Sequence, residues 1–237
     1  MTLETIITQL GTGLLKSILI FVLTLLGSLP LGLLVAFGRM SHWTPLRSLT
    51  GKNRGSLLRW LAELKPVQML VKLYISFMRG TPLMLQLMVV YFGPYYLLGL
   101  NIGQNYRFYA VIIGFVLNYA AYFAEIYRSG IESMPVGQYE AAAVLGYSRA
   151  QAFFKIILPQ VIKRILPSIT NEVITLVKDT SLAFAISYTE MFTIARRIAS
   201  SQATLMPFVV AGIFYYIFNF FMAWLMEQCE KKFSYFR

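Results

Sequence analysis

The chain has 237 residues, of which 57% are hydrophobic, 15% aromatic and only 13% charged. A water-soluble domain usually carries about 25% charged residues, so this composition argues against a soluble globular enzyme. The 21 Lys and Arg against 10 Asp and Glu leave a net charge of +11, which points to nucleic acid or to the cytoplasmic side of a membrane. A single Cys and a single His, Cys229 and His42, exclude a disulfide framework and a multi-Cys or multi-His metal site, so no metal is expected.

Four charge-free stretches are long enough to cross a membrane, which takes about 20 mostly apolar residues. They run from Ile18 to Phe37, Gly80 to Tyr106, Phe108 to Ala124 and Ile198 to Met226. A fifth segment, around 165–186, has the length of a span but carries Glu172, Lys178 and Asp179, which marks it as functional. We therefore predict an all-α integral membrane protein, one domain over 1–237, with spans at roughly 14–38, 67–98, 107–127, 165–188 and 204–227.

The positions of the cations predict the orientation, because five spans place the two termini on opposite sides of the membrane. Sixteen Lys and Arg fall on one side, and four fall on the other: Lys16, Arg107, Arg196 and Arg197. The N-terminus is therefore predicted outside and the C-terminus in the cytoplasm. The charge reports orientation and gives no support for nucleic acid as a partner. The basic insert 41–66 is expected to be a cytoplasmic loop beside membrane lipid.

Glycine and proline mark a break near the cytoplasmic end of the second span. Pro82 removes a backbone donor and Gly80 loosens the turn before it. We expect a kink or a helix start at this point.

The cytoplasmic segment 128–163 is too polar to be a span and too regular to be a linker. Residues 140–145 are good helix formers, and Gly146 is placed to end the turn in a left-handed conformation. Ser148 and Gln151 have the form of a capping box. The sequence thus predicts two short helices that meet at Gly146.

Small side chains give the first of these helices a face that another protein can approach closely. Ala141, Ala142 and Leu145 lie on adjoining faces at spacings of three and four residues. A docking helix and an amphipathic helix lying on the membrane fit these residues equally well.

Five motifs carry a resemblance to a known family. Glu140-Ala141-Ala142 with Gly146, followed by Ile157-Leu158-Pro159, resembles the EAA loop of permease subunits in ATP-binding-cassette (ABC) importers. The other motifs are similar to the polar amino-acid uptake branch of that family: Arg79-Gly80-Thr81-Pro82-Leu83, Glu125 with Arg128-Ser129-Gly130-Ile131, Gly137-Gln138, and Lys178-Asp179-Thr180-Ser181-Leu182. The resemblance implies a type I importer permease fold in the bacterial cytoplasmic membrane.

The same resemblance implies a set of partners. These are a second permease subunit, identical or related, two ATPase subunits that bind ATP and Mg, and an extracytoplasmic amino-acid-binding protein. No cofactor is expected in this chain, which has no phosphate-binding G-x-x-x-x-G-K-[ST] motif. In the family the EAA segment couples to the ATPase, a role that falls here by position on Gln138, Glu140, Ala141, Ala142, Gly146 and Arg149. Glu190, Arg196 and Arg197 are expected at the outer mouth, either where the binding protein docks or in a solvated loop.

The fourth span has a broad polar sector with charges of both signs. Glu172, Thr175 and Asp179 share one helical face, and Lys178 and Ser181 lie on the stripe beside it. Charged side chains facing lipid cost at least about 2.5 kcal/mol each, so this sector should face a partner or a watery path. Substrate contact and helix pairing both remain open for Lys178 and Asp179. Asn118 in the third span is either a path-lining amide or a contact between helices.

A rival function of a different class uses the same residues. In it, the chain is an oligomeric secondary transporter or channel, and Glu172, Lys178 and Asp179 relay an ion. Such a carrier has no reason for paired cytoplasmic helices. The leading prediction is therefore an ABC importer permease for a polar amino acid, itself without enzyme activity.

Overall fold

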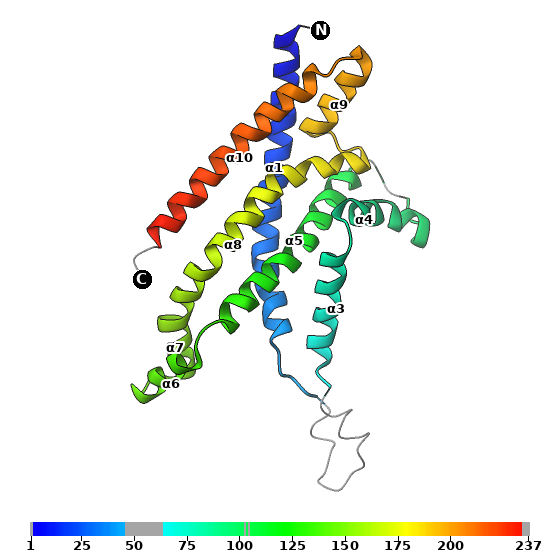
Figure 1. Cartoon of the computed structure of the whole chain (residues 1–237). Helices are drawn as coiled ribbons and strands as arrows, with labels where there is room; N and C mark the ends of the chain where they lie inside the picture. Colours follow the sequence, from blue (N-terminus) through cyan, green and yellow to red (C-terminus); the bar gives the residue numbers. More distant parts are fainter. Residues whose placement is uncertain (1, 46–63, 102, 104, 234–237) are drawn as a thin grey trace.

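The computed structural model describes residues 2–45, 64–101, 103 and 105–233, and these form an elongated bundle of helices (Figure 1). Most of the expected basic insert 41–66 lies outside the described residues. Helix α1, Leu3–Arg39, runs through the middle of the bundle and is about 55 Å long at 1.5 Å per residue. It therefore extends well beyond the span expected at 14–38. The side chain of Thr2 caps its start by accepting a hydrogen bond from the backbone N–H of Thr5.

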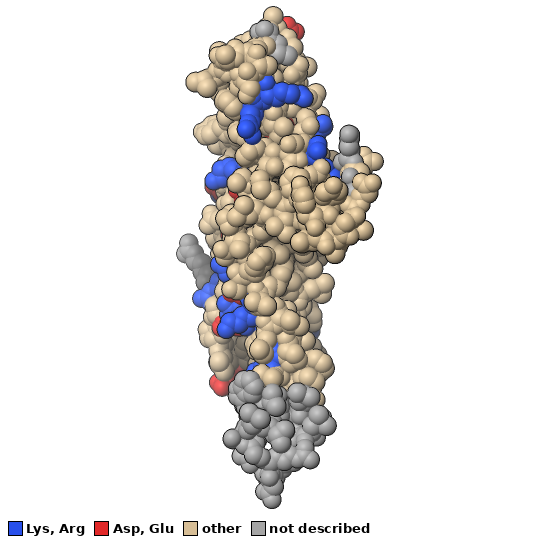
Figure 2. All heavy atoms as spheres, turned by 90° about the vertical axis from the view of Figure 1, so that its right-hand side faces the viewer, with Lys and Arg blue, Asp and Glu red and all other residues tan. Residues whose placement is uncertain are grey.

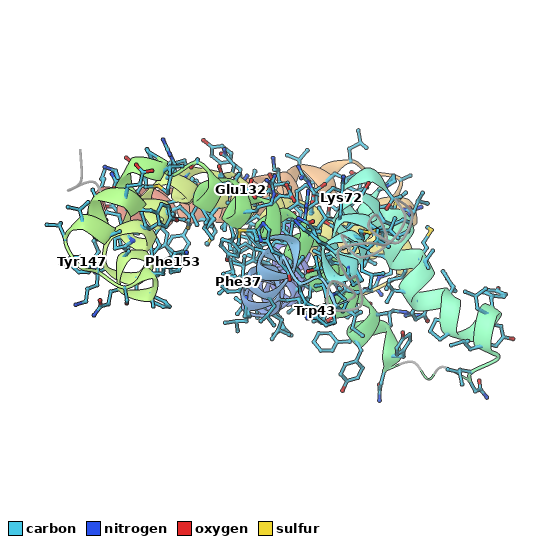
Figure 3. All side chains as sticks on the ribbon, turned by 90° about the horizontal axis from the view of Figure 1, so that it is seen from below. Phe37, Trp43, Lys72, Glu132, Tyr147 and Phe153 are labelled. Atoms are coloured by element: carbon cyan, nitrogen blue, oxygen red, sulfur yellow. The ribbon has the colours of Figure 1, made fainter. Side chains whose placement is uncertain are left out.

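The segment expected as a single second span is divided into two helices. Helix α3, Pro66–Gly80, and helix α4, Leu83–Leu98, meet at a bend of 110°. The break predicted at Gly80 and Pro82 is confirmed, but it is far sharper than a kink. Figure 3 shows α4 projecting from one side of the bundle, opposite the loop that carries Tyr147 and Phe153.

Helix α5, Tyr106–Glu132, packs along α1 and leads into the loop that joins it to α8. The loop contains α6, Val136–Val144, α7, Arg149–Ala152, and a π-helical turn, η2, Phe153–Ile157. Helix α8, Leu158–Asp179, then returns beside α5 and continues as a 3-10 helix, η3, Thr180–Ile186. The chain ends with α9, Met191–Gln202, and α10, Met206–Lys232.

Three helices among the described residues are long and apolar enough to cross a membrane, namely α1, α5 and α10. The bent pair α3 and α4 adds a fourth crossing if it counts as one span. Helix α8 does not meet this criterion because of its charges, so its membrane-spanning role remains a prediction. Figure 2 shows Lys and Arg in two groups on one face of the molecule, one in its upper part and one in its lower half, with mostly uncharged side chains between them.

The main core lies where α1, α4, α5 and α8 meet. Its buried side chains include Ile20, Leu87, Phe115, Tyr119 and Leu176. A second cluster joins the start of α1 to α9 and α10, and another, described below, holds the loop between α5 and α8. Together these clusters pack the long helices, α9 and the loop between α5 and α8 into one bundle.

Candidate coupling loop and transport path

The two short helices that meet at Gly146 form as predicted. Gly146 adopts φ +79°, a left-handed conformation that costs other residues roughly 1–2 kcal/mol. The hydroxyl of Ser148 accepts from the N–H of Gln151, and the Gln151 side chain accepts from the N–H of Ser148. The helix after this capping box has only four residues before the π turn, so it is shorter than a free-standing helix and merges with α8.

The tip of the loop is exposed and partly apolar. Val144 is 87% exposed and Leu145 is 74% exposed. Among the residues predicted to couple, Glu140, Ala141, Gly146 and Arg149 are exposed as well, but Ala142 is only 1% exposed and packs inward. Exposed apolar side chains grouped in this way mark a surface that binds another protein or a membrane.

The base of the loop is fixed to α5 and α8. Met134, Ile157, Val161 and Ile165 form a buried cluster with Tyr139 and Phe153 packed against it. Gln138 accepts a 2.9 Å hydrogen bond from the side chain of Gln160 on α8. These contacts join α6 to both long helices.

A glycine lets α5 and α8 approach closely just above this cluster. A Cβ added at Gly130 would lie 2.2 Å from Cγ2 of Ile165 and 3.3 Å from Cγ1 of Val161. Nearby, Nη1 of Arg164 donates to the carbonyl of Ser133 at 2.6 Å. The contact and the hydrogen bond join the end of α5 to the start of α8.

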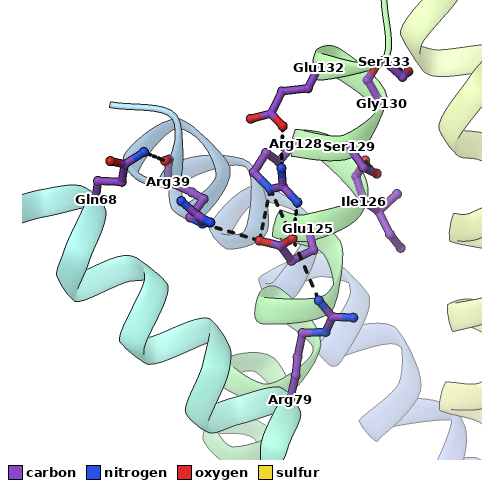
Figure 4. A network of polar contacts seen from close by, with 10 residues as sticks. All are labelled: Arg39, Gln68, Arg79, Glu125, Ile126, Arg128, Ser129, Gly130, Glu132 and Ser133. Carbon is purple, nitrogen blue, oxygen red and sulfur yellow. Dashed lines mark hydrogen bonds and ion pairs between the residues drawn. The ribbon is translucent and has the colours of Figure 1, made fainter. Parts of the chain in front are cut away.

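A network of charges joins α1, α3 and α5 at the same end of the bundle (Figure 4). The carboxylate of Glu125 on α5 forms ion pairs with three arginines. The distances are 2.6 Å to Arg128, 3.8 Å to Arg39 of α1 and 4.0 Å to Arg79 of α3. Arg128 also pairs with Glu132. The carboxylate of Glu125 thus holds three helices together, a role that the motif containing Glu125 and Arg128 did not reveal by itself.

Two buried amides hold the sharp bend between α3 and α4. The side chain of Gln86 donates to the carbonyl of Met78 at 2.9 Å and to the carbonyl and hydroxyl of Thr81 at 3.0 and 2.7 Å. Asn118 of α5 donates to the same Met78 carbonyl at 3.1 Å and to Oε1 of Gln86 at 3.0 Å. These amides satisfy carbonyls that the end of α3 leaves without helical partners. The described contacts of Asn118 are therefore those of an amide between helices.

The charges of α8 point in different directions. Asp179 accepts a 2.7 Å hydrogen bond from the hydroxyl of Tyr119 on α5. Lys178 is exposed and lines a hollow of about 340 Å³ with Ser181, Phe192, Phe208, Ala211, Gly212 and Tyr215, towards α9 and α10. Ser181 lies in the first turn of the 3-10 helix and lines the same hollow as Lys178, so the two residues remain neighbours as the sequence predicts.

One side of α8 carries a polar stripe that nothing in the described chain covers. Ser168 and Asn171 are exposed along it, and the Thr175 hydroxyl donates to the carbonyl of Asn171 at 2.9 Å. Glu172 is half-buried beside this stripe. The residues expected to line the path are thus divided between this open stripe and the contact with α5.

Glu190 differs from the expectation of an outer-mouth or solvated residue. Its side chain is fully buried, and it caps α9 by accepting from the backbone N–H groups of Phe192 and Thr193 at 2.7 and 2.6 Å. It also accepts from the hydroxyls of Tyr215 on α10 and Ser17 on α1, at 3.2 and 3.4 Å. A carboxylate with this many donors is a structural anchor.

Comparison with known proteins identifies the family. The description "Binding-protein-dependent transport system inner membrane component" matches residues 55–235. The chain belongs to this family of ABC importer permeases. The arginine transport system permease protein ArtQ of Bacillus subtilis (strain 168) is 37% identical over 173 residues, or 73% of this chain and 78% of ArtQ. The octopine transport system permease protein OccM of Rhizobium radiobacter is 36% identical over 212 residues, 87% of this chain and 84% of OccM.

Solved structures agree with this assignment. A crystal structure of an amino acid ABC transporter with histidines matches with a TM-score of 0.78 at 28% identity, over 95% of this chain and 94% of that chain. The inward-facing MetNI methionine ABC transporter matches with a TM-score of 0.68 at 15% identity, over 99% and 100%, and supports the fold alone. The permease is therefore a multi-pass inner-membrane protein with the type I importer fold, of the polar amino-acid type.

Two residues of the permease, Gln86 and Tyr119, escaped the sequence reasoning, and so did the anchoring role of Glu190. Gln86 is a polar residue in an otherwise apolar span, and the criterion that singled out Asn118 would have found it. Tyr119 and Glu190 gave no such signal, because their partners lie 60 and 173 residues away in the sequence.

Proposed function

We propose that this permease subunit carries a polar amino acid across the cytoplasmic membrane while a partner ATPase binds ATP and Mg and hydrolyses the ATP. The printed names of its relatives include permeases for arginine, L-cystine and octopine, and these names support an amino acid as cargo. The permease itself contributes the path and the coupling surface, and the hydrolysis belongs to the partner.

The observation that carries the proposal is the exposed tip of α6 on a base fixed to α5 and α8. The tip presents an exposed apolar surface formed by Ala141, Val144 and Leu145, which would bind in a groove of the ATPase. Closure of the ATPase subunits pushes or pulls α6 as a rigid unit. Because Gln138 and the buried cluster around Ile157 tie α6 to the long helices, the movement reaches the path. Glu140, Gly146 and Arg149 shape or flank this surface, and the buried Ala142 supports it from within.

A second permease subunit, identical or related, covers the polar stripe of α8. A stripe with Ser168, Asn171 and Thr175 is costly against hydrocarbon at bilayer depth, and Lys178 beside it adds a charge. Two such stripes facing each other would enclose a polar path, with Glu172, Thr175 and Asp179 beside it and Ser181 at its end. Asn118, which is buried behind Gln86, supports the path without lining it.

The cation distribution supports an orientation with the N-terminus outside and the C-terminus in the cytoplasm. Helix α6 and the network around Glu125 then lie on the cytoplasmic side, and α9 lies on the outer side. An extracytoplasmic amino-acid-binding protein delivers the cargo there.

The test is uptake by the permease reconstituted with its ATPase in vesicles. Uptake of a labelled amino acid is expected only with ATP and the binding protein together. Uptake driven by an ion gradient without ATP would support the ion-relay alternative instead. That alternative needs Glu172, Lys178 and Asp179 in one chain of contacts, whereas Lys178 lies in a hollow facing α9 and α10 and Asp179 is bonded to Tyr119.

A further inference from the structure

Helix α9 is held in one position by groups from two long helices. Glu190 caps its first turn and accepts from Ser17 of α1 and Tyr215 of α10. The inner face of the helix packs into the cluster that contains Ile6, Leu10 and Val210. An amphipathic helix of 12 residues anchored in this way presents its other face in a fixed orientation.

The other face of α9 is polar and basic. Arg196, Arg197, Ser200, Ser201 and Gln202 are all exposed on it. The guanidinium of Arg196 lies 5.4 Å from the centre of the Phe184 ring, a contact that holds the charge at the surface. Figure 2 shows basic side chains gathered in the upper part of the molecule, where α9 lies.

A basic hollow lies beside the start of α9. Its volume is about 600 Å³, and its lining includes Lys16 of α1, Arg107 of α5 and the two residues that precede Glu190, Tyr188 and Thr189. Arg107 donates to the carbonyl of Ser187 at 3.3 Å and so joins the hollow to the same loop. The acids of this end are Glu4, at the far tip of α1, and the buried Glu190.

Four cations, Lys16, Arg107, Arg196 and Arg197, lie at the end of the molecule opposite to most of the Lys and Arg of the chain. Membrane proteins place Lys and Arg mainly on the cytoplasmic side, so a cluster outside needs a separate reason. An anchored surface with four cations, whose one exposed acid lies at the tip of α1, attracts a partner with clustered carboxylates. We propose that the outer face of α9, together with the hollow at Lys16 and Arg107, is the docking surface for an acidic face of the extracytoplasmic binding protein. This inference rests on the proposed function and orientation.

The test measures how strongly the binding protein stimulates the ATPase of the complete transporter. The complex is placed in phosphatidylcholine nanodiscs, and the half-stimulating concentration of the liganded binding protein is measured from about 50 to 500 mM NaCl. For the unaltered complex we expect this concentration to rise steeply with salt. The double variant Arg196→Glu/Arg197→Glu should raise it about tenfold or more at low salt and flatten its salt dependence. The control Lys72→Glu/Lys232→Glu, with the same change of charge at the opposite end, should match the unaltered complex.

Three other outcomes would each overturn the docking surface, the binding-protein assignment or the proposed function. Equal half-stimulating concentrations and salt slopes for the Arg196/Arg197 variant and its control would overturn the docking surface alone. An effect that appears only when phosphatidylglycerol is added would assign the surface to lipid and overturn the proposal in that way. If the unaltered complex is not stimulated at any concentration, the proposed function fails, and the docking surface fails with it.

Discussion

The hydroxyl of Tyr119 donates a 2.7 Å hydrogen bond to Oδ2 of Asp179, joining α5 to the last residue of α8. This is the point where α8 gives way to the 3-10 helix η3. Tyr119 is almost completely buried, so the bond ties the polar end of α8 to the main core. The position of Asp179 therefore depends on α5 as well as on its own helix.

Removing the Tyr119 hydroxyl should displace Asp179 in the proposed transport path while leaving the packing of the core intact. The variant Tyr119→Phe keeps the ring and deletes the bond, which is worth about 0.5–2 kcal/mol in membrane proteins. We expect a lower melting temperature of the purified permease and a raised KM for amino-acid uptake. Tyr122→Phe on the same helix is the control and should change neither value. A Tyr119→Phe permease with normal KM would show that the bond does not position Asp179 for transport.

The left-handed turn at Gly146 makes a second prediction. Gly146→Val strains the turn by roughly 1–2 kcal/mol and adds bulk at the coupling surface, so capture of the ATPase and uptake should both fall at least tenfold. Gly99, with φ +64° at the end of α4, provides the matched control. Gly99→Val carries the same kind of strain away from the loop and should leave ATPase capture intact. Equal capture by the two variants would argue against coupling through α6.

The close approach of α5 and α8 makes a third prediction. Gly130→Ala forces a Cβ into Ile165 and should cost about 1–3 kcal/mol of stability, measured by thermal unfolding in detergent. Gly11→Ala, where the added Cβ meets nothing within 4 Å, should be neutral or slightly stabilising. Ile165→Ala alone should also destabilise, by about 2–5 kcal/mol, and the double variant should lose less than the sum of the two single losses. Strict additivity would show that the contact between the two helices is not the cause.

The bend between α3 and α4 makes a fourth prediction. Gln86→Leu and Asn118→Leu each leave the Met78 carbonyl with one donor fewer, and they also break their bond to each other. The two losses of stability should therefore be non-additive, with a coupling energy of about 0.5 kcal/mol or more in a double-mutant cycle. Strict additivity would contradict a shared role at the bend.

The sequence was informative where structure follows from neighbouring residues. Three local features were predicted correctly, namely the turn at Gly146, the capping box at Ser148 and the break at Pro82. Each depends only on residues a few positions away in the sequence, so the local pattern was enough to predict it. The anchor at Glu190 depends on hydroxyls of α1 and α10 that no local pattern connects. The contact of Asp179 with Tyr119 was missed for the same reason, because the two residues lie 60 positions apart in the sequence.

The central claim is ATP-driven import of a polar amino acid, and uptake into reconstituted vesicles tests it most directly. The permease, its ATPase and its binding protein are assembled, ATP is supplied on the ATPase side, and labelled amino acid is supplied with the binding protein on the other side. The account predicts accumulation that stops when ATP or the binding protein is left out. Accumulation that continues without ATP and follows an imposed ion gradient would contradict it.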